Sequence, residues 1–162
     1  MSQNRIISLK SIYRILERQE KTRFTLNGIE YVIKTDMKRS HSDIEYIRLF
    51  DETLGSNVAC VCYGGCFGHN LLKEQIDKHF CTFVFGYRTY EPFRNKGIMT
   101  RFVKQITEAL LQHFSSIVLV IEAANMYSEK VAINNGYIKL ADSYYPIYIK
   151  EKNIKETNNE KL

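Results

Sequence analysis

A strand-like run that leads through a basic, glycine-containing turn directly into an amphipathic helix is the most constraining feature of this chain. Residues 81–89 are rich in Thr, Val, Phe and Tyr, as strands are, and Glu91-Pro92 marks the end of the run because proline cannot donate to a sheet ladder. Beyond the turn, apolar residues recur at helical spacing, at Met99, Phe102, Val103, Ile106, Leu110 and Phe114. The pattern predicts a strand, a turn and a helix in direct succession.

The turn itself, Arg94-Asn95-Lys96-Gly97, has the composition of an anion-binding site. The first N–H groups of a helix have no intrahelical acceptor, and the aligned peptide dipoles add partial positive charge there. Gly97 allows a close approach to the backbone, while Arg94 and Lys96 add full charges. The turn therefore predicts a diphosphate site, and a solvated basic turn is the alternative interpretation.

A second segment repeats the order of strand and helix further along the chain. Residues 116–122, SIVLVIE, predict a buried strand. Asn125 is a suitable N-cap for the short helix that follows, and Gly136 is a suitable left-handed C-cap. Local chemistry alone therefore predicts a strand, a helix and a further strand here.

Taken together, the two segments resemble the GNAT N-acetyltransferases. The family signature R/Q-x-x-G-x-G/A is matched by residues 94–99, RNKGIM, in which Met99 replaces the usual small residue. The sequence Gly-Ile-Met-Thr is similar to a variant in the branch that acetylates protein amino termini. Residues 125–137 are similar to the family's N-x-x-S/A motif, helix and Gly-Phe/Tyr ending. The resemblance covers roughly residues 44–150, and its specificity comes from the pair of motifs.

The resemblance implies an α+β (mixed α/β) fold, with a mostly antiparallel, twisted central sheet, one splayed parallel strand pair and flanking helices. The rest of the chain fits such a sheet, because local patterns predict further helices and hairpins. These are a helix at 9–21, a hairpin at 24–34 that turns at Asn27-Gly28, a hairpin at 44–63, a short helix at 71–79 and a closing strand pair at 137–140 and 144–149. The family normally has two helices between its first two strands, and they form part of the wall of the acceptor site. Here a helix precedes a hairpin, so the resemblance says least about how this chain binds its acceptor.

Acetyl-CoA is the co-substrate that the resemblance implies. Its pyrophosphate would bind the backbone at Arg94, Asn95, Lys96, Gly97, Ile98, Met99 and Thr100. Its pantetheine would pair with the strand end at Tyr87, Arg88 and Thr89, where a backbone N–H near Arg88 or Thr89 would hold the oxyanion. Asn125 and Ser128 complete the cofactor contacts that we expect.

Acetyl transfer also needs groups that move protons from the amine and to the departing thiolate. Many relatives use a Tyr four residues before the glycine of the second motif, but that position is Ala132 here. The candidates for the acid are Ser128, which matches the serine of the terminal-amine branch, and Tyr127. Glu91 is the candidate base, with His79 and Glu122 as alternatives. Ordinary roles, a first-turn helix residue for Ser128 and a solvated carboxylate for Glu91, remain open.

Composition bounds the domain organisation and the metal chemistry. With 162 residues, 44% of them hydrophobic, we expect a single domain over residues 1–150 and a charged tail over 151–162. No run approaches the roughly 18 apolar residues of a membrane span and no signal peptide is evident, so we expect a soluble, cytoplasmic protein. The four cysteines are expected to be reduced thiols. Zinc at Cys60, Cys62, Cys66 and His69 is the alternative, but this spacing is not that of a zinc knuckle, and we predict no metal.

A net charge of +5 and a pI near 9.0 favour acidic partners. The basic residues are scattered and no nucleic-acid motif is present, so we do not expect nucleic acid as a partner. The leading hypothesis is an N-acetyltransferase that acts on a protein or peptide amino terminus or on a small amine, as a monomer or homodimer. A CoA-binding or acyl-CoA-binding module without turnover is the second hypothesis. An RNA-associated protein, whose affinity would fall steeply with salt, is the third.

Overall fold

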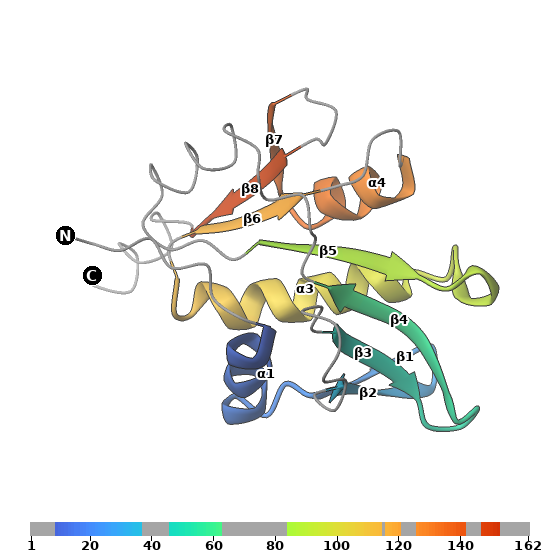
Figure 1. Ribbon diagram of the computed structural model, residues 1–162. Coiled ribbons are helices and arrows are strands. Elements are labelled where there is room, and N and C mark those ends of the chain that lie inside the picture. Colours follow the sequence, from blue (N-terminus) through green and yellow to red (C-terminus); the bar gives the residue numbers. More distant parts are fainter. Residues whose placement is uncertain are drawn as a thin grey trace.

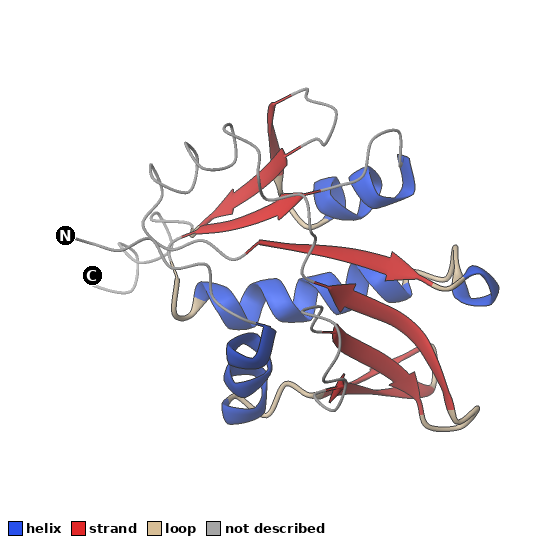
Figure 2. Cartoon of the chain, in the orientation of Figure 1, coloured by secondary structure: helices blue, strands red, loops and turns tan. Residues whose placement is uncertain are grey.

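The computed structural model describes residues 9–36, 46–62, 84–114, 116–120, 126–141 and 147–152. Its helices are α1 (Leu9–Arg18), α3 (Ile98–Leu111) and α4 (Met126–Asn134), with a 3-10 turn at Glu91–Phe93. Its strands are β1 (Arg23–Leu26), β2 (Ile29–Asp36), β3 (Tyr46–Asp51), β4 (Ser56–Cys62), β5 (Val84–Thr89), β6 (Ser116–Val120), β7 (Ile138–Ala141) and β8 (Ile147–Glu151). Figure 1 shows the elements by label, and Figure 2 separates helices from strands.

The described strands form one sheet in the order β1-β2-β3-β4-β5-β6-β8-β7. All neighbours are antiparallel except β5 and β6, which are parallel. This arrangement confirms the predicted α+β fold with a mostly antiparallel sheet and one parallel pair. The predicted hairpins are present, and the Asn27-Gly28 turn has positive φ at both residues (52° and 79°), as a two-residue hairpin turn requires.

Two helices cover one face of the sheet and form the core with it (Figure 1). Side chains from α1, α3 and the strands are almost completely excluded from solvent, the largest being Phe102, Leu9, Ile12, Leu16, Ile33, Ile47, Leu49, Ile106 and Leu110. Both helices were expected from their apolar spacing. α3 begins one residue before the predicted Met99 and ends at Leu111, and Phe114 still packs against the core. The helix α1 precedes the first hairpin, as the sequence predicted.

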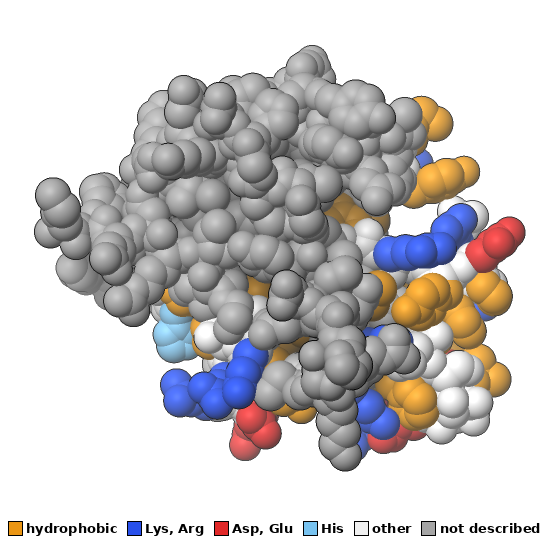
Figure 3. All heavy atoms as spheres, in the orientation of Figure 1, with side chains coloured by type: hydrophobic (Ala, Val, Ile, Leu, Met, Phe, Trp, Pro, Cys, Tyr) orange, Lys and Arg blue, Asp and Glu red, His pale blue; other side chains and the backbone are white. Residues whose placement is uncertain are grey.

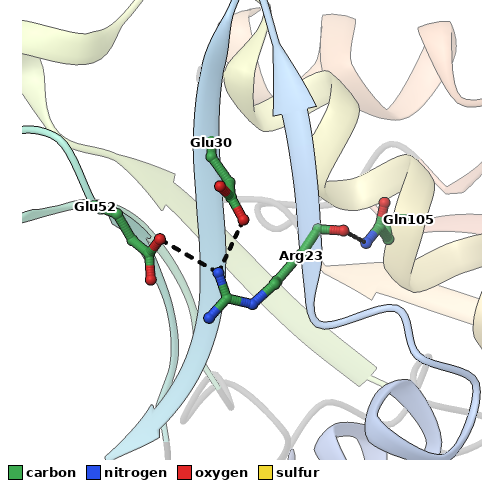
Figure 4. Close-up of polar contacts among 4 residues, drawn as sticks. All are labelled: Arg23, Glu30, Glu52 and Gln105. Carbon is green, nitrogen blue, oxygen red and sulfur yellow. Dashed lines mark hydrogen bonds and ion pairs between the residues drawn. The ribbon is translucent and has the colours of Figure 1, made fainter.

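Gln105 is a buried polar residue that ties α3 to the segment between α1 and β1. Its side-chain amide donates to the backbone oxygen of Lys21 (2.6 Å) and to that of Arg23 (3.0 Å; Figure 4). The guanidinium of Arg23 points the other way, to Glu30 and Glu52 at 2.9 and 3.3 Å. Gln105 therefore fixes the entry into the sheet, whereas the exposed ion pairs of Arg23 contribute little.

Replacing Gln105 with Ala should destabilise the fold by about 1–3 kcal/mol, because two backbone carbonyls lose a buried donor. Chemical denaturation of the wild type and the variant measures the difference. Gln112→Ala is the matched control, since Gln112 is exposed just after the same helix. Equal stabilities for the two variants would mean that the Gln105 contacts do not hold α3 to the sheet.

Several predictions lie outside the described residues, namely the helix at 71–79, the zinc alternative that needs Cys66 and His69, the alternative bases His79 and Glu122, and the N-cap Asn125. Strand β8 includes Glu151, one residue beyond the predicted domain boundary. Within the described ranges, no three His, Cys, Asp or Glu side chains are grouped so that they could hold a metal ion. None of the helices described here is long and apolar enough to cross a membrane.

Candidate functional site

A left-handed turn joins the end of β5 to the start of α3. Asn95 and Gly97 have φ values of 63° and 74°, and Gly97 is the N-cap residue of the helix. No side chain caps this end, and the first intrahelical bond runs from the Arg101 N–H to the Gly97 oxygen (3.2 Å). A Cβ placed on Gly97 would meet no described atom within 4 Å apart from its two neighbours in the chain, so the space around this position is open. Such a helix start can bind an anion through its backbone.

The side chains of the first turn of α3 anchor this end of the helix in the core. Ile98 and Met99 are 2% and 6% exposed and belong to the main hydrophobic cluster. The departure from the family signature at Met99 is therefore accommodated inside the protein, away from the exposed turn. The size of residue 99 is consequently compatible with a ligand at the helix start.

The two basic side chains of the turn are exposed beside the strand end. Arg94 donates from Nε to the backbone oxygen of Thr89 (3.1 Å), and the ammonium of Lys96 lies 5.8 Å from the centre of the Phe93 ring. In Figure 3, Lys and Arg side chains lie on the part of this face where Figure 1 shows the end of β5. The positive charges expected for a diphosphate site are thus present at the turn.

The two edges of strand β5 are paired over different residues. Toward β4, Tyr87, Arg88 and Thr89 oppose Val61, Cys60 and Ala59 in an antiparallel ladder. Toward β6, the described pairing consists of residues 84 and 85 opposite 118 and 119. The edge of β5 that faces β6 therefore has no strand partner after residue 85 among the described residues.

The hydroxyl of Tyr87 joins this strand end to α4 by donating a hydrogen bond to the backbone oxygen of Ser128. Burial raises the pKa of Tyr87, with the neighbouring Tyr137 and Tyr148 acting in the same direction, so the hydroxyl stays protonated and serves as a donor. We expected Tyr87 to contribute through its backbone alone. The side-chain contact was missed because it depends on how α4 packs.

The three predicted catalytic residues differ in their surroundings. Ser128 lies in the first turn of α4 and is partly buried beside Tyr87. Tyr127 precedes it and is 69% exposed, while Glu91 is exposed in the 3-10 turn after β5. The Tyr87 hydroxyl therefore links β5 to the backbone of Ser128. No described contact joins Tyr127 or Glu91 to that pair.

Asn135, for which the sequence pattern predicted no role, connects α4 to the start of α3. Its side-chain amide donates to the backbone oxygens of Thr100 (3.2 Å) and Val131 (3.0 Å), and its own backbone oxygen accepts from Lys150 Nζ (2.8 Å). Gly136 follows with φ of 79°, as the predicted left-handed C-cap. The only sequence signal for Asn135 was its place before this glycine.

No family model and no curated protein sequence matches this chain. Solved acetyltransferase structures do resemble it. Ribosomal-protein-S5-alanine acetyltransferase from Vibrio fischeri is 15% identical with a TM-score of 0.57, over 82% of this chain and 97% of that one. A GNAT-family acetyltransferase from Listeria monocytogenes is 9% identical with a TM-score of 0.56, over 80% and 99%.

A third solved structure, AAC(6')-Ib in complex with ribostamycin and coenzyme A, is 12% identical with a TM-score of 0.50, over 67% of this chain and 64% of that one. At such identities a likeness establishes the fold. The sheet order, the single parallel strand pair and these neighbours agree with one another. The chain has the fold of the GNAT acetyltransferases.

Proposed function

We propose that this protein transfers an acetyl group from acetyl-CoA to a primary amine. The observation that carries the proposal is the open, left-handed Gly97 turn at the start of α3, directly after a strand whose other edge is unpaired in the described residues. The first feature suits a pyrophosphate and the second suits an extended chain with amide groups. The coenzyme A held by a solved structure of the same fold adds support.

In this proposal the chain binds acetyl-CoA at two places. The amides of residues 94–100 receive the pyrophosphate, with Arg94 and Lys96 supplying charge. The backbone of Tyr87, Arg88 and Thr89 pairs with the pantetheine, which places the thioester where β5 and β6 part. Asn125 remains a proposed contact that lies outside the described residues.

The reaction then needs one bond formed and one broken. The neutral amine nitrogen attacks the thioester carbonyl carbon, and a backbone N–H near Arg88 or Thr89 stabilises the oxyanion. Collapse of the tetrahedral intermediate expels the CoA thiolate and leaves an amide. The proton lost by the amine balances the proton gained by the thiolate, so the products are an acetylated amine and a thiol.

Ser128 is the proposed proton source for the thiolate. Ser128 is partly buried, and its backbone accepts a hydrogen bond from Tyr87 of β5. Tyr127 is exposed and has no described contact with that strand. Ala132, at the position of the usual tyrosine, is completely buried and offers no hydroxyl. Glu91 is exposed close to the strand end and is the proposed base, acting through water.

Replacing Ser128 with Ala should lower kcat on the order of 10-fold and change the affinity for acetyl-CoA by much less, because Ser128 is only one of many expected cofactor contacts. The loss should be smaller than the roughly 10²–10⁴-fold typical of a positioned acid, because water can replace the hydroxyl. Thiol release from acetyl-CoA, measured with a panel of primary amines, gives kcat, and calorimetry gives the affinity. An unchanged kcat across the pH range would remove Ser128 from the mechanism.

The thiol-release assay also distinguishes the transferase from the second candidate function, a module that binds CoA without turnover. Buried Ala132 in place of the family's tyrosine is the observation that favours it. Such a module would bind acetyl-CoA and release no thiol with any amine. Amine-dependent thiol release would instead establish the transferase.

A further inference from the structure

Four side chains form a row across one face of the sheet, on neighbouring strands. Lys34 of β2 opposes Arg48 of β3, Arg48 opposes Cys60 of β4, and Cys60 opposes Arg88 of β5. Residues directly opposite each other in an antiparallel ladder point to the same face. The row therefore places three basic side chains and one thiol on a common surface.

This row lies on the face that α1 and α3 do not cover. The residues next to it in each strand, Ile33, Ile47, Leu49, Ala59 and Val61, belong to the core beneath those helices. Because successive side chains of a strand alternate between the two faces, the row is directed to the opposite side. In Figure 1, β4 passes in front of α3, and this opposite face is turned toward the reader.

Arg48 and Arg88 lie on either side of Cys60 in the strand register. One strand lies between them, so their backbones are about 10 Å apart. Both guanidinium charges act on the Cys60 thiol and on the hydroxyl of Tyr90, which hydrogen-bonds to that thiol. Burial raises the pKa of Cys60, so the group between the two arginines is a neutral thiol. Two cationic side chains thus act on one uncharged thiol that lies between them in the strand register.

Lys34 extends the row onto β2. Its ammonium lies 3.9 Å from the centre of the Phe50 ring, a cation–π contact. The arginines are better suited to hold an anion, since their planar guanidinium groups can donate two parallel hydrogen bonds to a carboxylate or phosphate. The pair Arg48 and Arg88 is therefore the stronger candidate.

The position of the row connects it with acetyl transfer. Arg88 lies between Tyr87 and Thr89, on the strand end where the thioester is proposed to sit. On the other face, Tyr87 packs against the core and bonds to α4, so described side chains occupy that side of the strand. An amine that approaches β5 from the face of the row would pass the two arginines.

We propose that Arg48 and Arg88 bind an anionic group, a carboxylate or a phosphate, carried by the amine that is acetylated. The inference rests on the proposed function and narrows its acceptor to acidic amines. The net charge of +5 favours the same class of partner. Acceptors with several positive charges, such as polyamines, would be repelled by Arg48 and Arg88.

Matched acceptors test the proposal through thiol release. The pairs are β-alanine and β-alaninamide, phosphoethanolamine and ethanolamine, and the amidated peptides Ser-Glu-Ala and Ser-Gln-Ala. They distinguish a small carboxylate, a phosphate and an acidic peptide as the source of the anion. In at least one pair the anionic member should have a KM about 10-fold lower, as a charged hydrogen-bonded pair warrants. Equal KM values within every pair would overturn the proposal.

Substitutions of the two arginines test whether the row causes the preference for anionic acceptors. Arg48→Gln should raise the KM of the anionic acceptor about 10-fold and leave that of its neutral partner unchanged, and Arg88→Gln should raise the ratio of the anionic to the neutral KM by the same factor. Arg88→Lys should restore part of the loss because it keeps the charge. Lys104→Gln is the control, since it removes one exposed positive charge from α3. Equal losses for both acceptors, or the same loss in Lys104→Gln, would contradict the assignment.

A binding measurement keeps this test separate from catalysis. N-Acetyl-β-alanine, N-acetylphosphoethanolamine and N-acetyl-Ser-Glu-Ala-amide, the corresponding products, are titrated into the CoA-loaded protein. At least one should bind the wild type and bind Arg88→Gln about 10-fold more weakly. If acetyl-CoA and CoA do not bind, the proposed function fails, and the same titrations into the free protein still decide the anion site. Absence of binding by all three products would exclude it.

Discussion

Replacing Gly97 with Glu is expected to abolish the binding of acetyl-CoA to this protein. A side chain at this position has open space around it at the helix start, because nothing described lies within 4 Å of the added Cβ. The carboxylate would occupy the proposed pyrophosphate position and repel its charges. The affinity should fall by at least about 100-fold, as expected when a like charge costs several kcal/mol at an interface. Isothermal titration of the variant with acetyl-CoA measures the loss.

Gly55→Glu is a matched control for this experiment. Gly55 also has a positive φ, 68°, and open space around its Cβ, but it lies in the turn between β3 and β4. Both substitutions therefore carry the same left-handed strain and the same change of charge. Acetyl-CoA should bind Gly55→Glu as it binds the wild type. Equal affinities for Gly97→Glu and the wild type would show that the turn is not the cofactor site.

Replacing Phe102 with Ala is expected to cause the largest loss of stability, about 3–5 kcal/mol, because it leaves a large cavity in the core. Phe102 is completely buried on the face of α3 that packs against the sheet. The same helix presents the Gly97 turn at its start. The variant should therefore unfold at a much lower denaturant concentration, as circular dichroism during chemical denaturation would show.

The control for the core is Leu54→Ala. Leu54 is 63% exposed in the turn between β3 and β4, so its truncation should change the free energy of unfolding by less than about 0.5 kcal/mol. A Phe102→Ala variant as stable as Leu54→Ala would mean that α3 does not pack on the sheet as described. Native gel filtration before denaturation checks that both variants begin folded.

Local chemistry predicted those parts of the fold that depend on a few adjacent residues. Asn27-Gly28 specified a hairpin because both residues tolerate positive φ, and the turn forms as expected. The spacing of Phe102, Val103 and Ile106 specified the buried face of α3. Gly97 identified the start of the same helix. In each case the determining residues lie within one turn or one helix.

Features that depend on the pairing of distant strands could not be predicted from the sequence. The row of Arg48, Cys60 and Arg88 exists only through the registers of β3, β4 and β5, which no local pattern sets. The bond from Tyr87 to Ser128 and the contacts of Asn135 depend on where α4 packs. The roles of Ser128, Tyr127 and Glu91 stay predictions, since no contact in the structure tests them and kinetic measurements must do so.

Isothermal titration of the wild-type protein with acetyl-CoA is the most direct test of the central claim. We expect saturable binding of one molecule per chain with a dissociation constant on the order of micromolar, corresponding to about −8 kcal/mol. Coenzyme A should bind in the same range, because the proposed contacts are with its pyrophosphate and pantetheine. If neither acetyl-CoA nor coenzyme A binds at millimolar concentration, the proposed function is wrong.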